Sequence, residues 1–281
     1  MVFLRLASIN GLRALARLAA LLLLILAPAA AQTQPAAPKI PSGVDLALVL
    51  AVDASRSIDE WEYNLQREGY VTAFSDSQVV KAIRSGPYGA IAVAYVEWSS
   101  DDQQQVVVDW TLIRDEATAA AFAARLKASE RHFMARTSIS GGVDFSVAVL
   151  AESGIRATRR AIDVSGDGVN NRGRPAQLAR DDAVKAGITI NGLAIINDRP
   201  QGWGAPIPLD QYYRENVIGG PGAFLVVASD FQSFGEAIRR KLVMEIAGCA
   251  PPLSDFCSDA ASHGHALVQW PGRAPGYKDP S

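Results

Sequence analysis

The chain of 281 residues contains few cysteines and histidines and has no excess of basic residues. Its two cysteines are too few for a disulfide-dense scaffold, and its three histidines offer little material for a catalytic base. A net charge of −2 leaves no basic surplus, which argues against nucleic-acid binding. Hydrophobic residues make up 49% of the chain and charged residues 20%, which is typical of a globular protein rather than a disordered one.

The first 31 residues have the pattern of a secretory signal peptide. Three arginines precede an apolar run at 18–27, which ends in a proline and three alanines at 28–31. A membrane anchor is the alternative, but a span needs about 20 apolar residues, and this run reaches that length only by including two of the arginines. No later apolar stretch is long enough to span a bilayer. We therefore expect cleavage after Ala31 and an exported, mildly acidic mature protein, periplasmic or secreted, with no membrane span.

The rest of the chain is expected to hold one α/β domain. Residues 32–43 are rich in proline and are predicted to form a linker. Strand patterns occur at 44–52, 88–98, 105–111, 160–165, 188–196 and 223–228, and helix patterns at 57–74, 115–127, 138–153, 175–186 and 230–247. This alternation predicts a six-stranded, mostly parallel sheet over 44–248, covered by helices on both faces. The strand at 105–111 follows a hairpin and should form an antiparallel edge.

Oxygen-bearing side chains follow two of the buried strands and precede one helix. Asp53, Ser55 and Ser57 come directly after the first strand, Asp167 follows a later strand, and Thr137 precedes a helix. Ligands of open α/β sheets bind at the carboxyl ends of the strands, where these residues should meet. Two carboxylates and three hydroxyls suit Mg²⁺, Mn²⁺ or Ca²⁺ better than Zn²⁺. We expect a divalent-cation site with one position open to a carboxylate from a partner protein.

The same motifs resemble those of the von Willebrand factor type A (vWA) domain and its metal-ion-dependent adhesion site (MIDAS). The resemblance rests on DxSxS at 53–57, T-S-I-S-G-G-V from Thr137 and V-S-G-D-G around Asp167, and it spans about 44–248. The chain is most similar to a bacterial, exported branch of that family. The resemblance implies a Rossmann-like, doubly wound sheet and direct metal ligation by the two serines and Thr137. It implies that the two aspartates bind the metal directly or through water.

Simpler explanations exist for each part of the predicted site. Asp53 and Ser57 could cap the first helix, and Asp167 could stand in an ordinary turn. Arg56 and Arg136 each lie beside an expected ligand. We predict that they contact a ligating acid or an incoming partner carboxylate, and the alternative is a solvated surface charge.

The tail at 249–281 is expected to be partly disordered. Cys249 and Cys257 lie in a proline-containing segment after the last helix, which in an exported protein favours a disulfide. A Cys₂His₂ zinc site with His263 and His265 is the alternative, although the spacing of the cysteines is wider than usual.

The leading functional hypothesis is an exported, divalent-cation-dependent protein-binding module for adhesion or assembly, and not an enzyme. It would accept an Asp or Glu from its partner. His132 is the only histidine within the domain, and no nucleophile-elbow motif is present. One alternative is a metal-assisted phosphoester hydrolase, for which no general base is evident. Another is a structural envelope component that binds through the long segment 197–222.

Overall fold

The structure is a computed structural model that describes residues 43–196, 207–248 and 268–269. The expected signal peptide at 1–31, almost all of the expected linker and both cysteines, Cys249 and Cys257, lie outside the described residues. The predictions made for them therefore remain predictions. Within the described part of the chain, no helix is long and apolar enough to cross a membrane.

The described residues form seven strands and seven helices. The strands are β1 (Val44–Asp53), β2 (Ile91–Trp98), β3 (Gln104–Ile113), β4 (Ala157–Gly166), β5 (Thr189–Ile195), β6 (Leu225–Ala228) and β7 (Val268–Gln269). The helices are α2 (Glu60–Phe74), α3 (Ser77–Arg84), α4 (Glu116–Lys127), α5 (Ile139–Glu152), α6 (Ala176–Lys185), α7 (Leu209–Asn216) and α8 (Phe234–Ala247).

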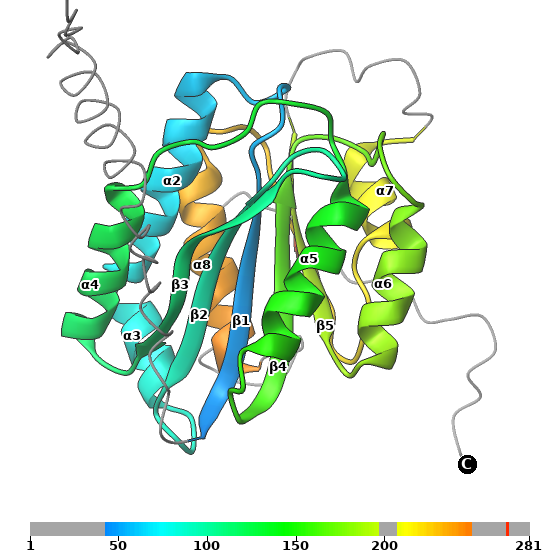
Figure 1. The fold of residues 1–281 in the computed structure, drawn as a ribbon. Coiled ribbons are helices and arrows are strands. Elements are labelled where there is room, and N and C mark those ends of the chain that lie inside the picture. The colour runs from blue at the N-terminus through cyan, green and yellow to red at the C-terminus, as the bar shows by residue number, and fades with distance from the viewer. Residues whose placement is uncertain (1–42, 197–206, 249–267, 270–281) are drawn as a thin grey trace, which may run out of the picture. The chain divides into compact units, whose positions relative to one another are not determined.

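The strands form one sheet in the order β3-β2-β1-β4-β5-β6-β7 (Figure 1). Strands β2, β1, β4, β5 and β6 run parallel, and β3 pairs antiparallel with β2. The predicted six-stranded, mostly parallel sheet with one antiparallel edge is therefore confirmed. The two-residue β7 pairs antiparallel with β6 and extends the sheet beyond the prediction, from within the tail that we expected to be partly disordered.

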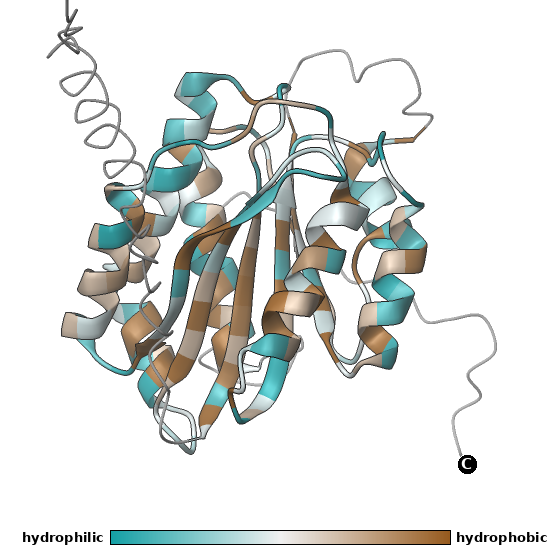
Figure 2. Cartoon of the chain, in the orientation of Figure 1, coloured by the Kyte–Doolittle hydropathy of each residue, from teal (hydrophilic) through white to brown (hydrophobic). Residues whose placement is uncertain are grey.

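Helices cover both faces of the sheet, as predicted. Helices α2, α3, α4 and α8 pack on one face and α5, α6 and α7 on the other (Figure 1). Side chains alternate between the two faces of a strand, so β1 contributes to both cores. Leu46, Leu48 and Leu50 lie in the first core, whereas Ala47 and Val49 lie in the second. This double burial explains why strand sequences are continuously apolar, as Figure 2 shows along the central strands.

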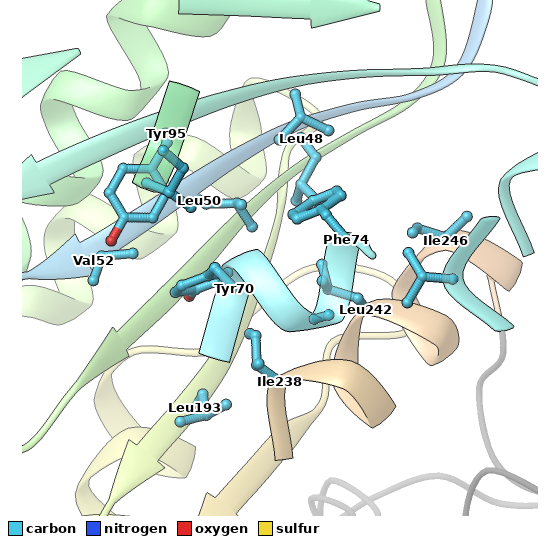
Figure 3. Close-up of a cluster of buried hydrophobic side chains, with 14 of the residues drawn as sticks. Leu48, Leu50, Val52, Tyr70, Phe74, Tyr95, Leu193, Ile238, Leu242 and Ile246 are labelled. Carbon is cyan, nitrogen blue, oxygen red and sulfur yellow. The ribbon is translucent and has the colours of Figure 1, made fainter. Parts of the chain in front are cut away.

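The first core is built around α2 and α8. Tyr70 of α2 makes an edge-to-face contact with Phe234 of α8, with ring centroids 5.5 Å apart. Figure 3 shows Tyr70 and Phe74 between the leucines of β1 and the apolar side chains of α8. The two helices approach closely at Gly69, where a Cβ atom would lie 2.6 Å from the Phe234 ring and 3.3 Å from the Cα atom of Gly235. Only glycine fits at this crossing.

Two helices were not predicted. Helix α3 is capped by Asp76, whose carboxylate accepts a hydrogen bond from the backbone N–H of Gln78 at 2.7 Å. Helix α7 lies within the glycine- and proline-rich segment 197–222, which we interpreted as one long loop. It begins directly after Pro208, a residue that is compatible with a helix start because it needs no hydrogen-bond acceptor.

Candidate metal centre

The five predicted ligands lie at one edge of the sheet. Asp53 is the last residue of β1, and Ser55 and Ser57 follow it in the loop to α2. Asp167 directly follows β4, and Thr137 stands two residues before α5. Strands β1 and β4 are hydrogen-bonded neighbours, so their carboxyl ends meet. The chain order also changes direction between them, with β2 on one side and β5 on the other, which is where α/β sheets leave a crevice for ligands.

Hydrogen bonds connect the five residues. Thr137 Oγ1 donates to Ser55 Oγ at 3.3 Å, and Ser55 Oγ lies 3.1 Å from Ser57 Oγ. Ser57 Oγ donates to Asp167 Oδ1 at 2.7 Å. Asp53 joins the network through Oδ1, which accepts from the backbone N–H of Ser55 at 2.7 Å. The structure thus brings all five residues together, while their role as metal ligands remains a prediction.

The carboxylate of Asp53 is poorly compensated. Asp53 is fully buried, and its Oδ2 atom has no hydrogen-bond partner in the described part of the chain. Burial, together with the nearby charge of Asp167, raises the pKa of Asp53 to about 8. Two acids placed together in a buried site destabilise each other, so the requirements of folding alone do not explain the pair.

The absence of a side chain at Gly166 leaves space next to Asp53. A Cβ atom on Gly166 would lie 2.9 Å from Asp53 Oδ2 and 2.9 Å from the Tyr213 hydroxyl oxygen, too close for a real contact. Tyr213 belongs to α7 and is fully buried, and its hydroxyl also has no hydrogen-bond partner among the described residues. Two unpartnered oxygen atoms therefore lie next to the same small space.

This donor set fits a hard divalent cation. Mg²⁺ in proteins is held by oxygen atoms, often from only one or two carboxylates, with other oxygens completing an octahedron. A dication would offset the charges of Asp53 and Asp167 and give Asp53 Oδ2 a partner. Nowhere in the described residues do three or more His, Cys, Asp or Glu side chains group as a metal site. Binding at this centre would therefore depend on the three hydroxyls as well as on the two acids.

Helix capping, the simpler explanation for Asp53 and Ser57, does not fit the structure. Helix α2 begins at Glu60, and its cap is Asp59, which accepts a hydrogen bond from the N–H of Glu62 at 2.9 Å. The Glu62 side chain in turn accepts from the N–H of Asp59 at 2.8 Å, which completes a capping box. Neither Asp53 nor Ser57 caps the helix, and both instead take part in the hydrogen-bonded cluster.

The segment that carries Thr137 is fixed on both sides. On one side, the N–H of Thr137 donates to Asn171 Oδ1 at 3.1 Å, and the N–H of Asn171 donates to the Thr137 carbonyl at 2.9 Å. On the other side, Ser138 N–H donates to the Ser99 carbonyl at 2.7 Å. These bonds place Thr137 Oγ1 against Ser55 without any need for a metal ion. Asn171 was not among the predicted site residues, although it stands four residues after Asp167.

Arg131 fixes the loop that carries the two serines. Its guanidinium Nη2 donates to the backbone carbonyls of Ala54, Ser55 and Ile58, at 2.9, 2.9 and 2.8 Å. Its side chain is only 7% exposed and lies over the Tyr63 ring, 5.1 Å from the centroid. Arg131 belongs to the same inter-helix connection as Thr137, so this connection holds both ligand-bearing loops. No sequence pattern marks it, because its acceptors are backbone atoms.

The structure does not bring Arg56 and Arg136 into contact with the predicted acids. Both residues are exposed, and neither side chain makes an ion pair with any described residue. Their backbones are close, because the N–H of Arg56 donates to the Ala135 carbonyl at 2.8 Å. The exposed side chain of Met134, which is 58% accessible, lies in the same segment. The prediction of contact with a ligating acid is thus not supported, and that of contact with a partner stays a prediction.

His132 contacts Glu97 and none of the five predicted ligands. Its Nδ1 is 3.4 Å from Oε2 of the buried Glu97, and its backbone N–H donates to the same oxygen at 3.1 Å. Glu97 also accepts a hydrogen bond of 2.5 Å from the Tyr63 hydroxyl. These contacts anchor the connection between α4 and α5 to the sheet. They give His132 a structural role.

Comparison with known proteins places the chain in a family. A profile of a family described as a protein of unknown function, DUF1194, matches residues 43–250, which is most of the chain. The chain belongs to the DUF1194 family. No curated protein matches the DUF1194 chain closely enough to count as a relative.

Solved structures establish the fold of the DUF1194 chain. It aligns with proximal thread matrix protein 1 of the mussel byssus at 16% identity and a TM-score of 0.50, over 73% of this chain and 46% of that one. Another structure of the byssus protein, described as having a zinc-occupied MIDAS motif, gives the same values. A von Willebrand factor type A structure from Catenulispora acidiphila aligns at 14% identity and a TM-score of 0.51, over 73% of this chain and 43% of that one. The DUF1194 chain therefore has the vWA fold, and it spans less than half the length of these proteins.

Proposed function

We propose that this chain is an exported protein-binding module, not an enzyme, that recognises its partner through a divalent cation, Mg²⁺ or in its place Mn²⁺ or Ca²⁺. The cation would be held by Asp53, Ser55, Ser57, Thr137 and Asp167. The observation that carries the proposal is Asp53 Oδ2, a buried carboxylate oxygen without a hydrogen-bond partner, close to a second acid. The vWA fold supports the assignment, because the residues lie at the carboxyl ends of β1 and β4, where open α/β sheets bind ligands.

A bound dication would have an open coordination position, to which a carboxylate oxygen of another protein can bind. With only two acidic ligands, the cation's charge is at most neutralised, so an additional carboxylate is still attracted. Ser57 is exposed, and it marks the side from which the centre can be reached. An Asp or Glu of a partner protein could therefore approach the metal there.

The residues around the centre favour an acidic partner surface. Arg56 and Arg136 are exposed beside the cluster and lie on two backbone segments that are hydrogen-bonded to each other. Met134, two residues before Arg136, adds an exposed apolar side chain to the same segment. Positive charges at the rim of an interface speed association with an acidic partner, and a central apolar contact adds affinity.

Cation binding is tested by calorimetric titration of the purified chain with Mg²⁺, Mn²⁺ and Ca²⁺. We expect wild-type protein to bind at least one of them and Asp53→Ala to lose that binding while keeping its far-UV circular dichroism. Asp102→Ala is a matched control, because Asp102 is an exposed acid at the same edge, between β2 and β3. Unchanged affinity in Asp53→Ala would refute the assignment of the site.

Partner binding needs a separate experiment. Immobilised wild-type chain is incubated with an envelope extract of the source organism in the presence of Mg²⁺ or of a chelator, and bound proteins are identified by mass spectrometry. We expect a protein that is retained with Mg²⁺, released by the chelator, and not retained by Asp53→Ala. A second variant has residues 197–206 replaced by a short linker. If this variant still binds the cation but no longer retains the protein, binding through that segment would be favoured instead.

A further inference from the structure

A lysine and an aspartate outside the predicted metal site are buried together. Lys241 of α8 and Asp163 of β4 both have side chains with no exposed area, and Lys241 Nζ lies 2.5 Å from Asp163 Oδ1. On the same helix, Ile238 and Leu242 contribute side chains to the core shown in Figure 3. The pair therefore joins α8 to the central strand β4 inside the protein.

A second acid is fixed beside the lysine nitrogen. Glu245 stands one helical turn after Lys241, and its Oε2 lies 3.3 Å from Lys241 Nζ. The other oxygen, Oε1, accepts a hydrogen bond of 2.9 Å from Asn191 Nδ2, and Asn191 Oδ1 accepts one from the N–H of Phe224. The glutamate is thus held in place with one oxygen directed at the lysine nitrogen.

The buried environment favours the uncharged form of the aspartate. Apart from the contact with Lys241, neither Oδ1 nor Oδ2 of Asp163 has a hydrogen-bond partner within the described residues. Burial raises the pKa of Asp163 to about 7, even though Lys241 opposes the shift. In a medium of low polarity, transfer of the lysine proton to the carboxylate exchanges two buried charges for a neutral amine and a neutral carboxylic acid. These are the forms in which an amine can attack a carboxyl carbon.

We propose that Lys241 and Asp163 join covalently, through an amide bond between Nζ and Cγ, with Glu245 as the proton-transfer group. The Nζ lone pair forms a bond to Cγ of the protonated Asp163 carboxyl group. Glu245 takes a proton from Nζ and delivers it to the departing hydroxyl, the C–O bond breaks, and one water molecule leaves. No electron is gained or lost by either side chain, and Glu245 ends in the state in which it began.

The structure offers the released water a place to go. A cavity of about 600 Å³ is lined by Glu245, Asn191, Phe224 and Met244, next to the Lys241–Asp163 pair. Water that leaves the reaction site for this cavity no longer opposes bond formation. The inference is independent of the metal centre, since none of these residues contacts the five predicted ligands.

The product can be measured on the full-length wild-type chain. We expect intact-mass spectrometry under reducing, denaturing conditions to give a mass lower than that of the processed sequence by one water molecule. Trypsin should fail to cleave after Lys241, and the peptide that begins at Lys241 should be found joined to the peptide 161–172. A full sequence mass, with normal cleavage after Lys241, would show that the two residues form only an ion pair and would overturn the proposal.

Variants test the roles of the acids. Glu245→Gln keeps an oxygen that can accept from Asn191 but has no acid–base function, so we expect most of the joined peptide to disappear. Glu236→Gln, which changes an exposed acid on the same helix, should leave the joined peptide at the wild-type level. Asp163→Asn can still react, with loss of ammonia in place of water, and its joined peptides should have the same mass as those of the wild type. If Glu245→Gln reacts as completely as wild type, Glu245 is not the proton-transfer group.

Discussion

Ser57 donates a hydrogen bond of 2.7 Å to Asp167, although the two residues are 110 positions apart in the sequence. The bond connects the loop after β1 to the loop after β4, and so it closes the predicted metal centre across the change of direction in the sheet. Asp167 contributes to the elevated pKa of Asp53 on the other side of the same centre. A single side chain therefore takes part in both the geometry and the electrostatics of the site.

Asp167→Asn should separate these two effects. The amide oxygen can still accept from Ser57, but the negative charge beside Asp53 is lost. We expect the affinity for Mg²⁺ to fall at least tenfold, whereas the metal-free chain becomes more stable by about 1 kcal/mol because the repulsion is relieved. Calorimetric titration gives the first quantity and urea unfolding in chelator gives the second. Equal Mg²⁺ affinities for variant and wild type would remove Asp167 from the ligand set.

Mg²⁺ should stabilise the wild-type chain. A ligand that binds only the folded state adds about 2.7 kcal/mol at a concentration one hundred times its Kd. For a domain of this size, that corresponds to a rise in Tm of roughly 5–10 °C. Thermal unfolding followed by circular dichroism, with Mg²⁺ and with chelator, measures the effect. Asp53→Ala should show the same Tm under both conditions, and a shift as large as that of the wild type would mean that Mg²⁺ binds elsewhere.

Gly166→Ala should damage the centre by steric overlap alone. Its Cβ atom would lie 2.9 Å from Asp53 Oδ2 and from the Tyr213 hydroxyl, and overpacking of this kind costs about 1–3 kcal/mol. We expect this loss in urea unfolding, together with weaker Mg²⁺ binding. Gly168→Ala is a matched control, since its Cβ atom would meet Thr137 only at 3.8 Å. Similar behaviour of the two variants would show that the space beside Asp53 is not restricted.

Arg131→Ala should weaken cation binding without removal of any ligand. Three backbone carbonyls lose their charged donor, which we expect to destabilise the fold by about 3 kcal/mol. The loop with Ser55 and Ser57 would also lose its fixed position, so Mg²⁺ affinity should fall several-fold in the fraction that remains folded. Lys127→Ala, an exposed change at the end of α4, should leave both quantities unchanged. Wild-type Mg²⁺ affinity in Arg131→Ala would show that the loop holds its shape unaided.

The double variant Arg56→Ala, Arg136→Ala should bind the cation normally but associate more slowly with the partner captured from the envelope extract. Long-range attraction of an acidic surface is screened by salt, so the difference from wild type should be largest at low ionic strength. Surface plasmon resonance at two salt concentrations measures the association rates. Arg172→Ala, which removes an arginine already paired with Asp101 at 2.9 Å, provides the comparison. Equal association rates for the double variant and wild type would show that both arginines are ordinary surface residues with no role in partner binding.

Much of the fold could be predicted because buried parallel strands leave continuous apolar runs in the sequence. The expected strand at 44–52 differs from β1 by a single residue. Helix α3 was missed because it is short, and its apolar residues Val79, Val80 and Ile83 occupy less than three turns. Helix α7 was missed because the glycines and prolines around it favoured a loop. Its buried residues Leu209 and Tyr213, spaced four apart, were the available signal.

The candidate ligands could be predicted because each stands directly next to the end of a recognisable element. The residues that hold them could not. Arg131 acts on backbone carbonyls, which every residue has, so its sequence neighbourhood contains no sign of its role. The hydroxyl of Tyr213 reaches the space beside Gly166 from a helix that was itself not predicted. Such contacts depend on tertiary packing and not on spacing along the chain.

The crossing of α2 and α8 at Gly69 has a mechanical consequence. The two backbones are very close there. Sliding of either helix along the other would therefore bring the Phe234 ring into steric overlap with the backbone at Gly69. The layer that supports the sheet from this side should therefore behave as a rigid base. Any adjustment of the protein to a bound partner would have to come from the loops at the carboxyl edge of the sheet.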